Sequence, residues 1–156
     1  MSDIALTVER TIDAPADAVW RVITDVEGFE AVLSGVTRVE RLAGAGYTIG
    51  TRWRETRRAR GRDESQELEV VGIDEGRSTM LAAESHGLAQ RTELTLEPAG
   101  GGTVLRMRFA GTFLAVSWVQ RVAARLTAKL GASTMRTMMQ QDLDDIAAAA
   151  EGLARS

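Results

Sequence analysis

Residues 4–20 read IALTVERTIDAPADAVW, and this stretch decides the fold. From Ile4 to Ile12 apolar and polar side chains alternate, which predicts a half-buried β-strand. Either Asp13 or Ala14 can cap a following helix, and Pro15 suits its first turn, where the missing N–H costs nothing. We therefore expect a strand that passes directly into a short helix.

The chain beyond this stretch divides into a strand-rich middle and a helical end. A second short helix carries Phe29 and Leu33 and ends near Gly35. Short alternating segments separated by Gly-rich turns then predict one antiparallel meander. The six expected strands cover residues 36–42, 51–60, 66–74, 78–86, 89–97 and 103–109. After Gly111 the residues are mostly strong helix formers, which predicts a long C-terminal helix.

The pattern of this last helix indicates how it packs. An apolar stripe recurs at steps of three and four residues, through Met135, Met139, Leu143, Ile146, Ala150 and Leu153. We expect Asp142, Asp144 and Asp145 to lie off the stripe, in water. A helix of 20 or more residues spans roughly 30 Å and can cross a seven-stranded sheet. The simplest way to bury both apolar surfaces is an α+β fold, with the antiparallel sheet wrapped around the helix.

Composition limits the possible functions. The 156 residues suit a single domain, 1–156, with 44% hydrophobic and 26% charged residues. A net charge of -3 gives no global attraction to nucleic acid. With no Cys and one His, His86, a thiolate or His-based metal site is excluded, and we expect no metal and no cofactor. The start of the chain shows no signal peptide and no segment is long and apolar enough to span a membrane, so we expect a cytoplasmic monomer or homodimer.

The element order and the motif at residues 12–20, IDAPADAVW, resemble the START/Bet v 1-like (SRPBCC) superfamily. Within it, the chain is most similar to bacterial polyketide cyclase/dehydrase-type proteins, and the resemblance covers nearly its whole length. It implies a helix-grip fold with two short helices between the first two strands. It also implies a cavity under the long helix that holds a lipid, polyketide or other apolar molecule. The motif is a packing signature, so the resemblance implies no catalytic residue.

The third expected strand indicates which face of the sheet points inward. Arg52, Arg54, Arg58 and Arg60 share one face with Thr56. Burying this row would desolvate several guanidinium groups, whereas an outward row can meet Glu67 and Glu69 across the strands. The outward orientation is therefore predicted. The row has no interleaved aromatic residues and the protein is acidic, which argues against a nucleic-acid surface.

This orientation places Trp53, Glu55 and Arg57 on the concave side. Glu55 and Arg57 are expected to form a mutual ion pair or to lie at a wet mouth. Alternatively, Arg57 holds a carboxylate or phenolate of a ligand and Glu55 accepts a hydroxyl or acts as a general base. His86 follows a strand with no clearly apolar face; a solvated turn is the expectation, and an inward His86 would be an acid–base candidate.

The expected ligand contacts lie on the inner strand faces, the second short helix and the last helix. They are Phe29, Leu33, Trp53, Glu55, Arg57, Leu68, Val70, Gln90, Thr92, Leu94, Met107, Phe109, Met135 and Met139. Residues 113–119 are apolar and are expected to cover the pocket or contact a second copy. Three functions stay open: binding of an apolar small molecule, a metal-free cyclase or dehydratase, and a protein-partner module that uses the outer Arg face.

Overall fold

The computed structural model describes residues 2–59, 61–114 and 117–156, without the side chains at 121 and 124–130. In chain order the elements are β1 (Ile4–Ile12), α1 (Ala16–Ile23), the 3-10 helix η1 (Val26–Gly28), α2 (Phe29–Val32), β2 (Val36–Ala43), β3 (Arg52–Ala59), β4 (Arg62–Asp74), β5 (Ser78–Ser85), β6 (Leu88–Ala99), β7 (Gly102–Phe113) and α3 (Trp118–Arg155). The predicted α+β helix-grip fold is confirmed. Pro15 itself precedes α1, so neither Asp13 nor Ala14 is its N-cap.

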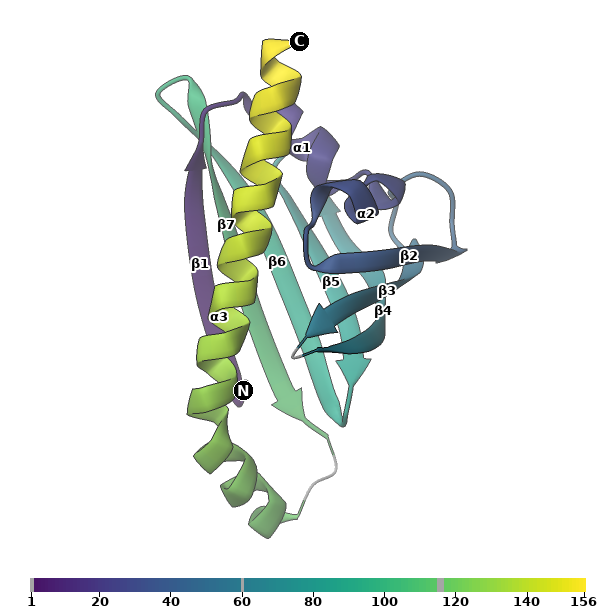
Figure 1. Ribbon diagram of the computed structural model, residues 1–156, viewed down its shortest axis with the longest axis vertical. Helices are drawn as coiled ribbons and strands as arrows, with labels where there is room; N and C mark the ends of the chain where they lie inside the picture. The colour runs from purple at the N-terminus through teal and green to yellow at the C-terminus, as the bar shows by residue number, and fades with distance from the viewer. Residues whose placement is uncertain (1, 60, 115–116) are drawn as a thin grey trace.

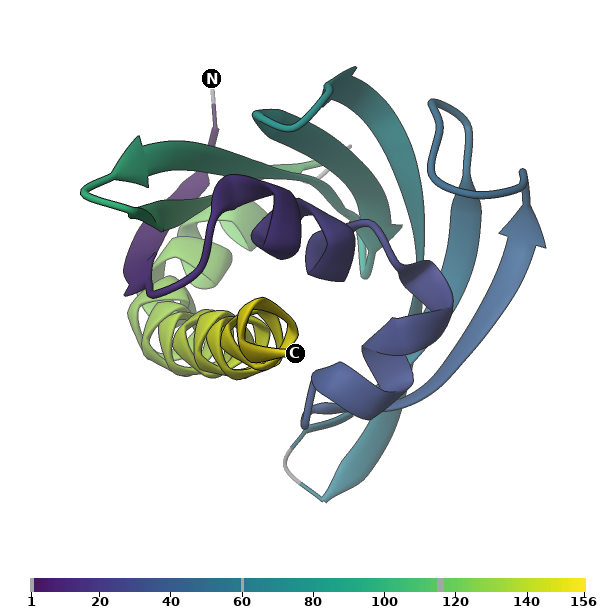
Figure 2. The same cartoon turned by 90° about the horizontal axis from the view of Figure 1, so that it is seen from above.

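The strands of the described residues form one antiparallel sheet in the order β1-β7-β6-β5-β4-β3-β2 (Figure 1). β1 pairs along its whole length with the last strand, from Ile4 opposite Gly111 to Ile12 opposite Thr103. β2 therefore lies at the other edge, and α1 and α2 cross one end of the sheet between the two edges. Seen from above, the curved sheet and these helices wrap around one side of α3 (Figure 2).

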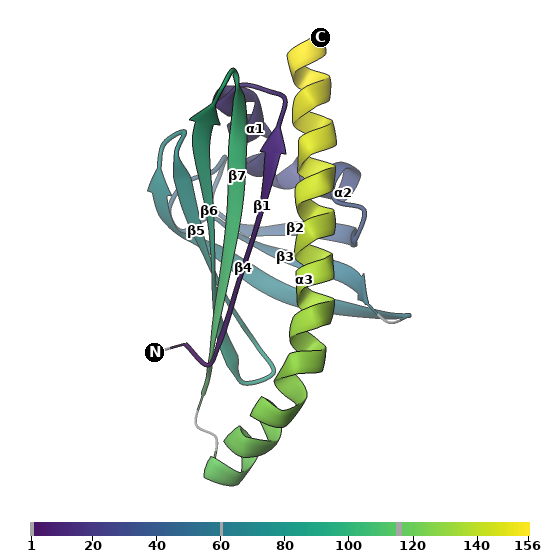
Figure 3. The same ribbon diagram turned by 90° about the vertical axis from the view of Figure 1, so that its left-hand side faces the viewer.

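α3 begins with a capping box. The Ser117 hydroxyl accepts a hydrogen bond from the Gln120 amide, and the Gln120 side chain accepts one from the Ser117 amide. The helix has 38 residues. At the α-helical rise per residue this corresponds to a length of about 57 Å. Its first turns extend past the ends of the strands, and only its later part lies along the sheet (Figure 3). No described helix is long and apolar enough to cross a membrane.

The aspartates of α3 fix the helix to three other elements. Asp142 is 8% exposed and binds β3, so the prediction that it lies in water is wrong. Asp145 is half-buried and accepts hydrogen bonds from the backbone and hydroxyl of Ser34, which also contradicts the prediction. Asp144 is exposed as expected, although it forms an ion pair with Arg10 on β1. These contacts set the position of α3 over the sheet.

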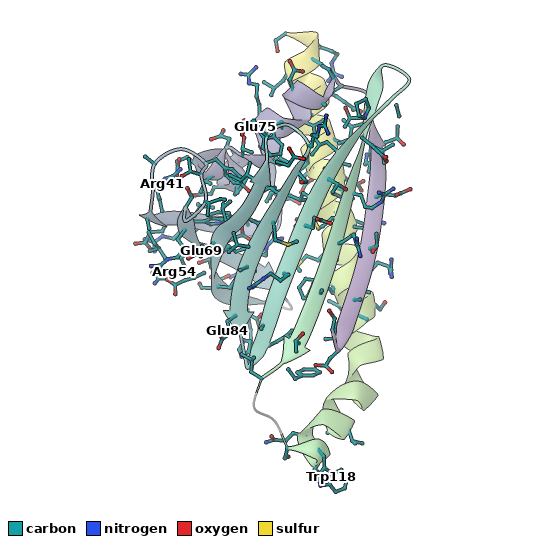
Figure 4. All side chains as sticks on the ribbon, turned by 180° about the vertical axis from the view of Figure 1, so that it is seen from behind. Arg41, Arg54, Glu69, Glu75, Glu84 and Trp118 are labelled. Atoms are coloured by element: carbon teal, nitrogen blue, oxygen red, sulfur yellow. The ribbon has the colours of Figure 1, made fainter. Side chains whose placement is uncertain are left out.

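The outward orientation of the arginine row on β3 is confirmed for its described members (Figure 4). Arg54 lies 3.3 Å from Glu40 and 3.8 Å from Glu67, and Arg58 lies 3.1 Å from Asp63. Such exposed pairs contribute less than about 1 kcal/mol each. Arg60 lies outside the described residues. The opposite face of the same strand is buried at Trp53 and Glu55, and this face forms part of the site.

Candidate functional site

A cavity of about 470 Å³ lies between the inner face of the sheet and α3. This volume falls within the range of small-molecule sites in proteins, roughly 300–1,000 Å³. Most of the lining is apolar, and it comes from α1, α2, five strands and the later part of α3. The lining residues are Val22, Ile23, Phe29, Val32, Leu33, Trp53, Glu55, Arg57, Ala59, Glu64, Ser65, Gln66, Leu68, Leu81, Ala82, Ala83, Ser85, His86, Leu88, Gln90, Thr92, Leu94, Met107, Phe109, Phe113, Met135, Met138, Met139, Asp142 and Ile146.

Of the side chains predicted to contact a ligand, all but Val70 line this cavity. Val70 points inward but is completely buried, with 0% exposure. Its amide donates to the Thr51 carbonyl, and its carbonyl accepts from the Gly50 amide, where the chain enters β3. The cavity wall at this point is formed instead by Trp53, whose ring contacts that of Phe29 at a centroid distance of 5.7 Å.

The inner face of β5, which the sequence left open, consists of its odd-numbered residues. The β4–β5 register places Leu81 opposite Val70 and Ala83 opposite Leu68. Since Val70 and Leu68 point inward, Leu81 and Ala83 do so too. Thr79 on the same face is 1% exposed. Leu81 and Ala83 line the cavity and also pack against the edge of the core.

His86 occupies an exposed two-residue turn between β5 and β6, as expected. His86 and Gly87 both have positive φ, 52° and 74°, which is the conformation of a type I′ hairpin turn. His86 reaches the rim of the cavity, two strands away from β3 in the sheet order. The structure therefore brings it to the same cavity as Glu55 and Arg57 but, among the described residues, into no hydrogen bond or ion pair with either of them.

The expected cover at residues 113–119 is described only in part, because 115 and 116 lie outside the described residues. Phe113 lines the cavity, whereas Trp118 and Val119 are 76% and 57% exposed. Trp118 projects from the start of α3, away from the sheet (Figure 4). In this conformation the two exposed side chains do not cover the cavity.

Three charged side chains meet on the cavity wall, and we call them the Glu55–Arg57–Asp142 cluster. Nε of Arg57 donates to Glu55 Oε1 at 2.5 Å, which confirms the predicted ion pair. The two terminal nitrogens of Arg57 donate to the two oxygens of Asp142, at 3.0 and 2.8 Å. Nε1 of Trp53 donates to the other oxygen of Glu55 at 3.4 Å. The bidentate contact fixes the guanidinium plane and ties β3 to α3.

Burial and mutual charge set the electrostatics of the cluster. Burial raises the pKa of Asp142 above its ordinary value, an effect that outweighs the opposing influence of Arg57 and is reinforced by the charge of Glu55. Burial acts to lower the pKa of Arg57, but the charges and hydrogen bonds of Glu55 and Asp142 raise it above its ordinary value. Arg57 is therefore a permanent cation, and Asp142 is the group of the pair whose protonation is favoured by its surroundings.

Asp142 is the charged residue of the cluster whose place on the cavity wall was not predicted from the sequence. The signal was present, because Met135, Met139, Asp142 and Ile146 follow one another at steps of four, three and four. That spacing places Asp142 on the buried stripe. Its charge alone led to the prediction of a solvated position. An acidic residue on an apolar helical stripe, opposite an inward-facing Arg, indicates a buried ion pair.

The architecture and the cavity define a class of protein: a helix-grip domain with an apolar interior and a polar cluster on one wall. Residues 3–151 match the family model described as polyketide cyclase / dehydrase and lipid transport. The chain belongs to this family. Among proteins of curated function, no sequence matches it.

Solved structures share the fold at low sequence identity. TTHA0849 from Thermus thermophilus is 22% identical, with a TM-score of 0.79 over 97% of this chain and 99% of that one. The Zhui aromatase/cyclase from Streptomyces sp. R1128 is 18% identical, with a TM-score of 0.77 over 95% and 93%. Ginseng major latex-like protein 151 from Panax ginseng is 11% identical, with a TM-score of 0.73 over 93% and 95%.

Proposed function

We propose that the protein binds an apolar small molecule of lipid, polyketide or aromatic type in this cavity, without altering it. The observation that carries the proposal is the unfilled volume of about 470 Å³ behind a mostly apolar lining. A void of this size forfeits packing energy, so a fold that only needed stability would fill it. Met135, Met138 and Met139 on α3 add a flexible wall that can adapt to an irregular ligand.

A substitution that fills the cavity tests this proposal. Ala83 lines the cavity from β5, and Ala89, its matched control, lies on the outer face of β6 opposite Glu84. We expect Ala83→Phe to abolish binding of the neutral fluorophore N-phenyl-1-naphthylamine, because the ring occupies the ligand volume. Ala89→Phe is expected to leave binding unchanged. Equal binding by both variants, each folded by circular dichroism, would contradict the proposal.

The natural ligand can be identified by mass. Native mass spectrometry of the protein purified from its own host should show a population heavier than the chain by one small molecule. The same purification of Ala83→Phe should lack that population. If wild type and Ala83→Phe carry the same mass, the molecule is bound elsewhere.

One observation favours a second function, a cyclase or dehydratase that uses the cluster as an acid. Burial raises the pKa of the Asp142 carboxyl, which lies on the cavity wall within reach of a bound molecule. In its protonated form this carboxyl can donate its proton to a leaving hydroxyl, and the resulting carboxylate can take a proton from the adjacent carbon, so that water and a C=C bond form and the acid is restored. The fixed Arg57 holds the carboxyl in place. Molecules that co-purify with wild type and with Asp142→Asn distinguish the two functions. A mass difference of one water indicates dehydration, and identical masses indicate binding alone.

A further inference from the structure

We propose that the polar group of the ligand is a hydrogen-bond donor, best a protonated amine, and that the site discriminates against carboxylates. This inference rests on the proposed binding function and specifies the chemistry of the ligand for the same cavity. It follows from the Glu55–Arg57–Asp142 cluster, and it differs from the sequence-based expectation that Arg57 holds an anionic ligand.

The donors of Arg57 are largely in use. Its Nε and both terminal nitrogens already donate to carboxylate oxygens, each at 3.0 Å or less. A guanidinium has five N–H groups, so two are left. An anionic ligand would have to share this cation with two buried carboxylates that already hold it.

The acceptors of the cluster have spare capacity. A carboxylate offers about four lone-pair sites, so Glu55 and Asp142 together offer about eight. Three are taken by Arg57 and one by Trp53. With about four sites open and only two N–H groups left, the group that best complements the wall is one that donates.

The charges on the cavity lining also favour a cationic ligand over an anionic one. Among the described residues that line the cavity, the carboxylates are Glu55, Glu64 and Asp142, and the only Arg is Arg57. Glu64 lies directly opposite Arg57 in the β3–β4 register, at the exposed end of the site. When these carboxylates are ionised, three negative charges face one guanidinium, so these four groups together carry excess negative charge. A cation entering this wall is attracted, whereas a carboxylate meets two like charges away from bulk water.

The apolar lining sets the rest of the ligand. On α1, on α2 and at one end of β6, Val, Ile, Phe and Leu side chains line the cavity. These side chains cannot pair with a second charge on the ligand. A ligand with one donor group at the cluster and an apolar body along α3 satisfies both parts of the cavity. An alkyl or aromatic amine has this chemistry.

Three probes of one chain length test the proposal: dodecylamine, dodecanol and dodecanoate, each below its aggregation limit, displacing N-phenyl-1-naphthylamine at pH 7. We expect dodecylamine to bind at least about tenfold more tightly than dodecanoate, which corresponds to about 1.4 kcal/mol, with dodecanol between them. Asp142→Asn, which removes one buried negative charge, should reduce this ratio by about tenfold. Asp144→Asn is the matched control, because Asp144 lies on the same helix but pairs with Arg10 in solvent.

The outcomes separate this inference from the proposed function. If none of the three probes displaces the fluorophore from wild-type protein, the binding function itself fails. If dodecanol and dodecanoate bind at least as well as dodecylamine, the cavity binds ligands and the donor preference is wrong. If Asp142→Asn and Asp144→Asn lower the ratio equally, the preference reflects the overall charge of the protein, and the cluster is not its source.

Discussion

Replacing Arg57 by Met should reveal how much the cluster depends on its one cation. The substitution keeps the apolar stem but leaves two carboxylates, at 4% and 8% exposure, without their counter-charge. Removing one partner of a buried ion pair typically costs about 3–5 kcal/mol. Two carboxylates share this Arg, so we expect the upper part of that range. A domain of ordinary stability, about 5–15 kcal/mol, would lose a large fraction of it.

Urea unfolding at pH 7, followed by circular dichroism and tryptophan fluorescence, measures the loss as a lower midpoint at constant slope. The sign of the pH dependence is a second test. Burial already raises the pKa of Asp142, so its contribution to stability is present at acidic pH and lost as pH rises through the folded-state pKa. Without Arg57 that pKa rises further, and Arg57→Met should be penalised less at pH 5 than at pH 7.

A neutral version of the cluster is the control. The triple variant Glu55→Gln/Arg57→Met/Asp142→Asn removes all three charges while keeping similar side-chain volumes. It should recover most of the stability lost in Arg57→Met, because replacing a whole buried charge cluster is often neutral or favourable. A cost for Arg57→Met below about 1 kcal/mol at pH 7 would show that solvent already screens these charges. A triple variant as unstable as the single one would show that the loss comes from missing side-chain contacts and not from unpaired charge.

Four further substitutions have definite expected outcomes. Tyr47→Phe removes the 2.7 Å hydrogen bond between the Tyr47 and Thr79 hydroxyls. The Thr79 hydroxyl still donates to the Gly72 carbonyl in this variant, so it is not left without a partner. The lost hydrogen bond should therefore lower the free energy of unfolding by only about 1 kcal/mol at pH 7. Burial raises the pKa of Tyr47 to about 12, so the wild-type protein should also lose stability as the pH rises from about 10 to about 12. The urea midpoint measured as a function of pH should show this loss for the wild type and not for Tyr47→Phe. Gly102→Ala places a Cβ 2.5 Å from the Ile12 carbonyl and should lower the melting temperature. Gly152→Ala meets nothing within 4 Å and should raise the melting temperature slightly, through up to about 1 kcal/mol of helix propensity. His86→Asn keeps the positive φ that the turn requires, and we expect unchanged stability and unchanged fluorophore affinity. A loss of affinity would show that the imidazole of His86 contacts the bound molecule.

The fold was predictable from sequence because each of its elements carries its own periodic signal. The alternation from Ile4 to Ile12 indicated β1 with its observed bounds. The even spacing of strands indicated the meander. What the sequence did not determine is pairing over long range: β1 closes on β7 across most of the chain, and no local pattern records that partner. The lengths of β4 and β7 were also underestimated. The first residues of β4, 62–65, are all polar and show no alternation. The end of β7 was missed because Ala110 and Gly111 interrupt its pattern before Phe113.

The site was predictable where burial and polarity agree and unpredictable where they conflict. Leu68, Leu94, Met107 and Phe109 follow from alternation alone. Glu55 and Arg57 were found because an outward Arg row forced the neighbouring positions inward. Asp142 was missed because a charge on a helix is usually solvated, and the pairing that overrides this rule comes from β3, 85 residues away. Long-range contacts of this kind need coordinates.

Stability and binding make opposite demands on the Glu55–Arg57–Asp142 cluster, and this opposition separates a structural role from a functional one. If the cluster only holds α3 to β3, a neutral triple variant that folds equally well should bind every probe as the wild type does. If it selects ligands, the same variant should be as stable as the wild type or more so, yet lose its preference for an amine over a carboxylate. A buried charge excess that adds nothing to stability but governs which polar group enters an apolar cavity is best explained by the ligand that it receives.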